Sequence, residues 1–168
     1  THLFVIITDP HLRYAQEELH DRSLEMLIVQ PCNRETGPSI LLPLLHPHRR
    51  DPEAVVVLLP SYHFVWEEQR FMAAVKHAAA CVSERPDYPI LLRATVLLEL
   101  FQELTPELMD AFEPIAQALG SPREAEAMRT AYAKLPTVNF SEAILARCPH
   151  CLGVLRVQGV YWSDWGDP

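Results

Sequence analysis

Two groups of polar residues follow short apolar runs, at positions where an open α/β sheet would place a ligand. The first group consists of the small Gly37 and the polar residues Asn33, Arg34, Thr36 and Ser39. It follows the apolar run 26–29 and leads into a predicted helix, whose free backbone donors could hold a planar base or an anion. A capped loop has the same composition, so both interpretations stand.

The second group, Ser61, Tyr62 and His63, follows the apolar run 54–59. In an open α/β sheet, ligands bind at the carboxyl ends of the strands, so these residues lie where a site is expected. His63 is then either a site residue or a loop histidine whose hydrogen bonds are satisfied within the protein.

The segment Cys148-Pro149-His150-Cys151 has the C-x-x-C spacing of thiol oxidoreductases. In thioredoxin-like folds the first cysteine stands at a helix N-terminus, where the helix dipole favours the thiolate. Here a predicted helix, 140–147, precedes the motif and a predicted strand follows it, so the thiolate is disfavoured. A plain turn is the favoured interpretation, redox catalysis is an alternative, and reduced thiols are expected.

Short apolar runs alternate with amphipathic stretches in the first half of the chain. The runs 3–7, 26–29 and 54–59 predict strands buried on both faces of a parallel sheet. Apolar positions at helical spacing predict helices over 10–20 and 67–82, the second of which should lay one stripe on the sheet. The order is that of an α/β fold with a mostly parallel sheet.

The pattern changes abruptly at Arg93, after a possible fourth strand that starts at 89–92. The stretch 93–134 predicts consecutive helices, two of which open at Pro106 and Pro122 after the possible caps Thr105 and Ser121. We interpret this stretch as a helical insert within a single domain, and its apolar surface suggests a homo-oligomer.

After the insert, Asn139 and Ser141 can start a short helix over 140–147, and the chain returns to a strand over 152–157. The 168 residues are about the length of one domain. We therefore treat 1–168 as one domain.

The composition excludes two classes of partner. The chain carries 14 basic and 22 acidic residues, a formal charge of −8, whereas nucleic-acid binding depends on cations that neutralise phosphates. No apolar run reaches the roughly 18 residues that a membrane-spanning helix needs. We expect a cytoplasmic protein with no nucleic-acid partner and no membrane contact.

Three motifs together resemble those of the sugar nucleotidyltransferases, most closely the mannose-1-phosphate guanylyltransferase-like group. They are Gln30-Pro31 with Asn33-Arg34-Glu35-Thr36-Gly37-Pro38, then Leu59-Pro60-Ser61-Tyr62-His63-Phe64, and Gly159-Val160-Tyr161-Trp162-Ser163-Asp164-Trp165-Gly166. They occur in the family's order, and the intervening segments also look like the family.

This resemblance implies a Rossmann-like fold of the GT-A type, in which a sugar 1-phosphate attacks the α-phosphate of a nucleoside triphosphate and releases pyrophosphate. It implies Mg²⁺ as cofactor and Asp164 as a metal ligand. It also places 33–39 beside the nucleotide base, and Ser61 and His63 at the border of the nucleotide. GTP and mannose 1-phosphate are the expected substrates, and GDP-mannose is the expected product.

The chain departs from the family pattern at three places. Tyr62 stands where the family has its first catalytic Asp, and a neutral phenol is a poor ligand for a hard cation. The family's glycine-rich phosphate loop has no counterpart, and the central sugar-binding stretch is missing between Leu92 and Arg93. We therefore expect an incomplete version of the fold.

Two hypotheses explain these gaps: the sequence is an incomplete record of a larger nucleotidyltransferase, or the protein is a degenerate relative repaired by a partner chain. A function from a different class also stays open. The chain is then a catalytically inactive nucleotide-binding or subunit-interaction protein built on the same scaffold.

Overall fold

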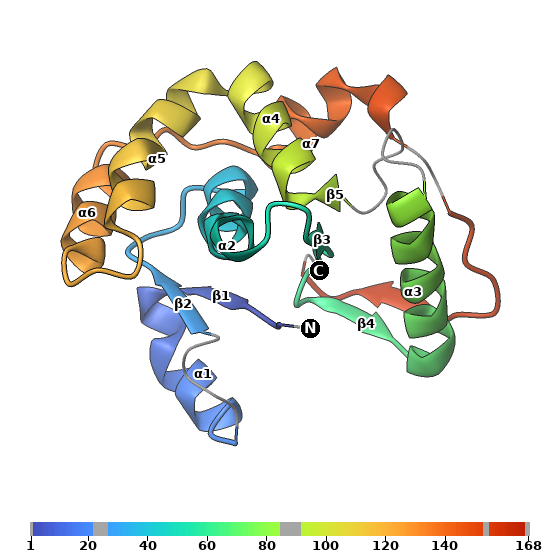
Figure 1. Ribbon diagram of the computed structural model, residues 1–168. Helices are drawn as coiled ribbons and strands as arrows, with labels where there is room; N and C mark the ends of the chain where they lie inside the picture. Colours follow the sequence, from blue (N-terminus) through green and yellow to red (C-terminus); the bar gives the residue numbers. More distant parts are fainter. Residues whose placement is uncertain (1, 22–26, 85–91, 153–154, 167–168) are drawn as a thin grey trace.

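The computed structural model describes residues 2–21, 27–84, 92–152 and 155–166, and is a mixed α/β structure (Figure 1). Its strands are β1 (Val5–Thr8), β2 (Leu27–Gln30), β3 (Val55–Val56), β4 (His63–Val65), β5 (Leu92–Arg93) and β6 (Trp162–Asp164). Its α-helices are α1 (Leu12–Glu18), α2 (Thr36–Arg50), α3 (Glu68–Glu84), α4 (Ala94–Leu104), α5 (Pro106–Ala118), α6 (Glu124–Tyr132) and α7 (Phe140–Ala143). Short 3₁₀ helices cover Asp9–His11, Leu145–Arg147 and Pro149–Cys151. Within these ranges, no helix is both long enough and apolar enough to span a bilayer.

The strands form three separate two-stranded sheets among the described residues, rather than one continuous sheet. Of these three pairs, only β1 and β2 are parallel, with Val5 opposite Leu27. The pairs β3–β5 and β4–β6 are antiparallel. The prediction of a mostly parallel sheet is therefore wrong beyond the first pair, because an apolar run indicates a strand but not its partner or its direction.

The predicted strand 54–59 is confirmed for only two residues, Val55 and Val56. Beyond them no strand of the described ranges pairs with the run. Leu58 and Leu59 are exposed, and Pro60 has no N–H with which to extend a ladder. His63 therefore opens a new strand, β4, instead of following the end of a strand as predicted. The predicted strand 152–157 also fails, since 155–157 have no regular structure and 153–154 lie outside the described residues.

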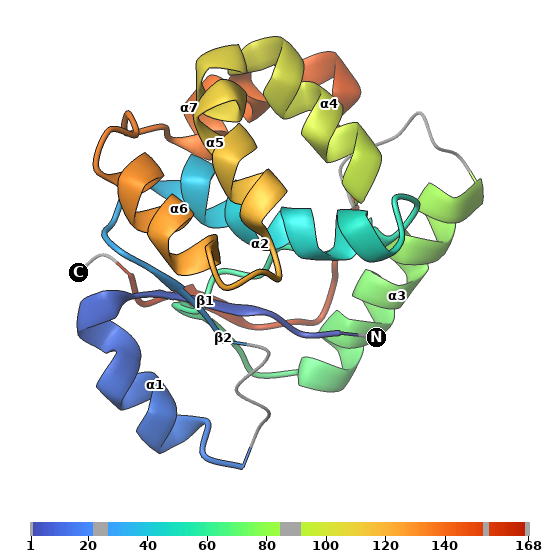
Figure 2. The ribbon, with the colours of Figure 1, turned by 60° about the vertical axis from the view of Figure 1, so that its left-hand side comes forward.

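The helices predicted over 93–134 are confirmed as α4, α5 and α6, and they pack on α2 to make most of the core (Figure 2). Leu41 of α2, Leu97 and Phe101 of α4, Phe112 of α5 and Tyr132 of α6 are fully or almost fully buried. These helices are therefore a central part of the structure that holds β2 and α2 in place.

Helix starts follow the expected caps in part. The Asn139 carboxamide oxygen accepts hydrogen bonds from the backbone N–H groups of Ser141 and Glu142, which confirms the predicted start of α7. The hydroxyl of Thr105, a possible cap of α5, instead donates back to the Phe101 carbonyl at 2.9 Å. In the predicted helix 10–20, residues 9–11 are 3₁₀ before α1 begins at Leu12.

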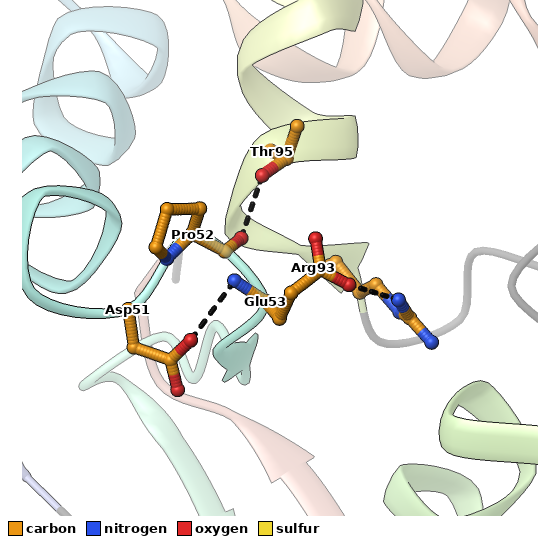
Figure 3. A network of polar contacts seen from close by, with 5 residues as sticks. All are labelled: Asp51, Pro52, Glu53, Arg93 and Thr95. Atoms are coloured by element: carbon orange, nitrogen blue, oxygen red, sulfur yellow. Dashed lines mark hydrogen bonds and ion pairs between the residues drawn. The ribbon is translucent and has the colours of Figure 1, made fainter.

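The start of α4 is tied to the turn after α2 by polar contacts (Figure 3). The Thr95 hydroxyl donates to the Pro52 carbonyl at 2.6 Å, and the Ala94 N–H donates to the Ala54 carbonyl at 2.8 Å. Arg93 pairs with Glu53 beside them. Leu92 and Arg93, between which the sequence resemblance predicts a missing stretch, are consecutive residues of β5.

Candidate functional site

The second and third motifs meet in space through the pairing of β4 with β6. His63 lies directly opposite Asp164 in the antiparallel register, and its Nε2 is 3.9 Å from the Asp164 Oδ2. Both side chains are partly exposed, His63 at 30% and Asp164 at 44%. The two-stranded β4–β6 ribbon thus presents a carboxylate and an imidazole side by side to solvent, where they can contact a charged ligand.

Two aromatic rings hold the His63 imidazole. The Tyr62 ring meets it edge-on at 5.0 Å between centroids, and the Trp162 ring does so at 4.9 Å. The backbone of Tyr62 also accepts a hydrogen bond from the Trp165 N–H at 2.9 Å, which fixes its place in the ribbon. Tyr62 therefore lies beside His63 and Asp164 and presents a ring there, not a carboxylate.

Asp164 supplies the carboxylate of this arrangement. Its Oδ1 accepts a hydrogen bond from the Gly166 N–H at 2.8 Å, and its Oδ2 faces His63. Among the residues that the structure describes, no three His, Cys, Asp or Glu side chains gather in a way that could hold a metal ion. Mg²⁺ is commonly bound by one or two carboxylates together with substrate phosphates, and Asp164 offers one such carboxylate.

Ser61 lies in the turn that leads into β4, where the His63 N–H donates to the Pro60 carbonyl at 3.3 Å. Ser61 is exposed next to Tyr62, so its hydroxyl is open to solvent at the entrance to the ribbon. That Ser61 borders a ligand held near His63 stays a prediction.

The first motif, 33–39, forms the start of α2 and makes its hydrogen bonds with a different part of the molecule. The Gly37 N–H donates to the Val138 carbonyl at 2.7 Å, and the Arg34 Nε donates to the Tyr132 carbonyl at 3.1 Å. The Thr36 hydroxyl accepts from the Phe140 N–H at 2.8 Å. The Gly37 N–H, one of the backbone donors that the sequence led us to expect free for a ligand, is therefore used within the fold.

Asn33 and Ser39 complete this local network. The Asn33 Oδ1 accepts from the Glu35 N–H at 2.8 Å, and Glu35 has a positive φ of 69°. The Ser39 hydroxyl donates to the Glu35 carbonyl at 2.9 Å and contacts the Gln30 side chain. These bonds favour the capped-loop interpretation of the motif over free donors, because the polar groups stabilise the turn before α2.

The structure therefore divides the predicted site residues into two groups. Within the part of the chain that the structure describes, Tyr62, His63 and Asp164 come together through contacts inside the ribbon, while the long-range hydrogen bonds of 33–39 run to the segment 132–140. The prediction that one crevice between parallel strands holds both groups also fails in its geometry, because β4 and β6 are antiparallel.

Sequence reasoning missed a buried polar cluster beneath the first motif. The Tyr132 hydroxyl donates to the Gln30 Oε1 at 2.9 Å, and both residues are almost completely buried. Burial, with a smaller contribution from the nearby Cys32, raises the pKa of the Tyr132 phenol, so the hydroxyl keeps its proton and donates. The available signal was a single Gln at the end of an apolar strand.

The cysteines also differ from expectation. Cys148 is in a disulfide, although the sequence favoured reduced thiols, whereas Cys32 and Cys81 are free. Cys148 follows the 3₁₀ turn Leu145–Arg147, so the predicted position of the motif after a helical segment is confirmed. The 3₁₀ turn that follows it, Pro149–Cys151, opens on a proline, which has no N–H to donate to a thiolate.

Comparison with known proteins finds partial relatives. No protein-family model matches the chain. The chain is 29% identical over 82 residues to the xanthan biosynthesis protein XanB of Xanthomonas campestris pv. campestris (strain B100). This match covers 48% of this chain and 18% of XanB. The chain is also 32% identical over 78 residues to the mannose-1-phosphate guanylyltransferase of Escherichia coli (strain K12). That match covers 44% of this chain and 16% of that enzyme. The matched segment thus spans less than a fifth of these curated relatives.

Among solved structures, the chain is similar to the crystal structure of mannose-6-phosphate isomerase from Helicobacter pylori. The TM-score is 0.77 at 14% identity, and the match covers 97% of this chain and 85% of that chain. At this identity the likeness concerns the fold alone. The chain therefore shares a fold with a protein named as an isomerase and is similar, over nearly half of its length, to proteins named for mannose 1-phosphate guanylyl transfer and xanthan biosynthesis.

Proposed function

We propose that this chain is part of a nucleotidyltransferase that transfers a nucleotidyl group from a nucleoside triphosphate to a sugar 1-phosphate. The observation that carries the proposal is the pairing of β4 with β6, which sets His63 beside Asp164 from distant parts of the chain. These residues belong to the two motifs that resemble the family's carboxylate motifs. The partial similarity to a mannose-1-phosphate guanylyltransferase supports GTP and mannose 1-phosphate as the substrates.

The reaction needs positioning and charge stabilisation more than a protein nucleophile. A phosphate oxygen of the sugar 1-phosphate forms a bond to the α-phosphorus of the triphosphate, and the bond to pyrophosphate breaks. The His63 imidazole can donate a hydrogen bond from a ring N–H to a phosphate oxygen, and its two aromatic neighbours fix the ring for that contact.

Asp164 is the residue that would hold Mg²⁺ in this function. When bound, Mg²⁺ neutralises charge on the phosphate oxygens during the transfer. The Gly166 N–H keeps the Asp164 carboxylate in a defined orientation through its hydrogen bond to Oδ1, which leaves Oδ2 facing the partly exposed side of the ribbon. We assign the base to 33–39 on the strength of the motif resemblance.

Isothermal titration with GTP, with and without Mg²⁺, tests the proposal. Mg²⁺-dependent binding is expected, Asp164→Asn should weaken it, and Tyr62→Asp should strengthen it by adding a second carboxylate. Asp110→Asn on the exposed side of α5 is the matched control and should change nothing. GTP binding that ignores both Mg²⁺ and Asp164→Asn would contradict the enzyme assignment.

A second candidate function is a non-catalytic nucleotide-binding or subunit-interaction protein. The observation that favours it is Tyr62, which is 48% exposed beside His63 and supplies no anionic oxygen to a metal. This function predicts that neither the wild type nor Tyr62→Asp shows metal dependence in the same titration. It also predicts no pyrophosphate release from GTP and mannose 1-phosphate.

A further inference from the structure

The register of the short β4–β6 ribbon is weakly fixed by its two strands alone. In β6, Trp162 and Asp164 are exposed and Ser163 is half-buried, and the residues of β4 are half-buried throughout. Register is strongly specified where one face of a strand is buried in a core, and weakly specified elsewhere. A two-stranded ribbon is also marginally stable in water. A shift of one residue would replace Asp164 as the partner of His63.

Backbone hydrogen bonds continue the ladder beyond both ends of the strands. The Trp165 N–H donates to the Tyr62 carbonyl at 2.9 Å, and the Trp66 N–H donates to the Tyr161 carbonyl at 3.1 Å. Residues that are paired in this way in an antiparallel ladder exchange two such bonds. The Tyr161 N–H instead donates to the Glu67 Oε2 at 2.6 Å. The Glu67 carboxylate thus takes the acceptor position that the Trp66 carbonyl would hold in a longer ladder.

The start of α3 holds Glu67 in this place. In Figure 1, β4 leads directly into α3, and Glu67 is the residue before that helix begins. Its carbonyl accepts from the Phe71 N–H at 3.0 Å, and a carboxylate at a helix N-terminus is stabilised by the helix dipole. In the first turn of α3, the Arg70 Nη1 donates to the Gly159 carbonyl at 3.5 Å. Two side chains at the start of α3 therefore hold the segment that leads into β6.

We propose that Glu67 is a positioning residue for the nucleotidyl transfer, because its bond to Tyr161 sets the register that places Asp164 beside His63. The bond joins positions 94 apart in the sequence, so it ties β6 directly to the end of β4. A hydrogen bond to an ionised acceptor is roughly twice as strong as a neutral one. The proposal rests on the proposed function, in which Asp164 would hold Mg²⁺ and His63 would contact a phosphate oxygen.

Nuclear magnetic resonance on the full chain tests the register without a ligand. His63 and Asp164 lie between ladder hydrogen bonds, where the Cα atoms of paired strands come closest, so the wild type should show a strong Overhauser effect between their Hα atoms. Glu67→Ala should lose this signal. It should also speed hydrogen exchange of the Tyr161 amide at least about tenfold, as expected when a hydrogen bond to a charged group is lost.

Isothermal titration with GTP and Mg²⁺ tests whether this register serves the reaction. Glu67→Ala should raise the dissociation constant about tenfold, because only molecules in the native register present Asp164 beside His63. Glu67→Gln keeps a side-chain oxygen that accepts the same bond, and should stay within about twofold of the wild type and retain the resonance signals. Glu68→Ala removes a charge at the next, exposed position and is the matched control, which should change neither measurement.

The outcomes separate this proposal from the proposed function. If the wild type binds no GTP with Mg²⁺, the proposed function fails, while the resonance signals still decide whether Glu67 sets the register. A His63–Asp164 signal that persists in Glu67→Ala would overturn the inference, and so would a Glu67→Gln variant that behaves like Glu67→Ala. A wild-type Tyr161 amide that exchanges as fast as an unprotected one would overturn it even if Glu67→Ala does not fold.

Discussion

Replacing Gly37 with Ala separates a structural role for the first motif from a ligand-binding role. A Cβ atom at Gly37 would lie 2.7 Å from the Val138 carbonyl oxygen and 2.9 Å from the Val138 Cγ1. The nearest atom belongs to the backbone, so no side-chain rotation relieves the clash. The segment carrying Val138 must move away from the start of α2, which breaks the 2.7 Å hydrogen bond from the Gly37 N–H.

The expected cost follows from three contributions. Overpacking at a tight contact costs about 1–3 kcal/mol, and the lost backbone hydrogen bond costs about 1 kcal/mol more. Alanine in place of glycine within a helix returns up to about 1 kcal/mol. The free energy of unfolding should therefore fall by about 2 kcal/mol.

Urea unfolding followed by circular dichroism measures this change. With an m-value of about 2 kcal/mol/M, the midpoint should fall by about 1 M and the slope should stay the same. Gly166→Ala is the matched control, because its Cβ meets the ring of the exposed Tyr62, which can move, and it should cost less. If Gly37→Ala leaves the urea midpoint unchanged but weakens GTP binding, the structural role of Gly37 is refuted. That result would favour a ligand that approaches the Gly37 backbone closely.

Further substitutions test other parts of the structure. Burial is the largest cause that lowers the pKa of His46 from its ordinary value of 6.5, so the unfolded chain takes up the proton first as the pH falls. The free energy of unfolding should therefore fall as the pH drops below about 6.5. His46→Gln should flatten that dependence in urea titrations at several pH values. Tyr132→Phe removes the hydroxyl that donates to the buried Gln30 and should lower the free energy of unfolding by about 1–2 kcal/mol. Thr95→Val should cost about 1 kcal/mol by removing a hydrogen bond at the start of α4. Glu53→Gln should cost less than about 1 kcal/mol, because the Glu53 side chain is 63% exposed in its ion pair with Arg93.

Each of these expectations can be contradicted by a specific result. A pH dependence that survives His46→Gln but disappears in the exposed His2→Asn would place the titrating group elsewhere. If Tyr132→Phe and the wild type have the same midpoint of thermal unfolding, Gln30 has found another hydrogen-bond donor in the variant. A larger loss for Glu53→Gln than for Thr95→Val would show that the ion pair, and not the hydroxyl, holds α4 in place.

The sequence predicted the helices best, because their signals are local. Apolar spacing identified α3 and α4, and Asn139 caps α7 as its side-chain chemistry predicts. The strands β1 and β2 also appear close to the predicted runs, and they are parallel as expected. Each of these features depends on residues within a few positions of one another, or on a strand, a helix and the next strand in order.

Pairing between distant segments could not be predicted from the residues. The antiparallel match of β4 with β6, the short β3 and the separation of the sheet into three pairs depend on which edges meet after the helices have packed. Hydrophobic periodicity says that a strand needs a partner, but it carries no information about which strand that is.

For the site, the amino-acid sequence alone supplied the residue types: a carboxylate at Asp164, an imidazole at His63, a phenol at Tyr62 and a polar turn at 33–39. Tertiary structure decided their neighbours. It brought His63 next to Asp164, and it joined polar groups of the turn to the segment 132–140 through hydrogen bonds. The physical reason is that hydrogen bonds and ring contacts form between whichever groups the folded backbone brings within a few ångströms, and chain position does not set that distance.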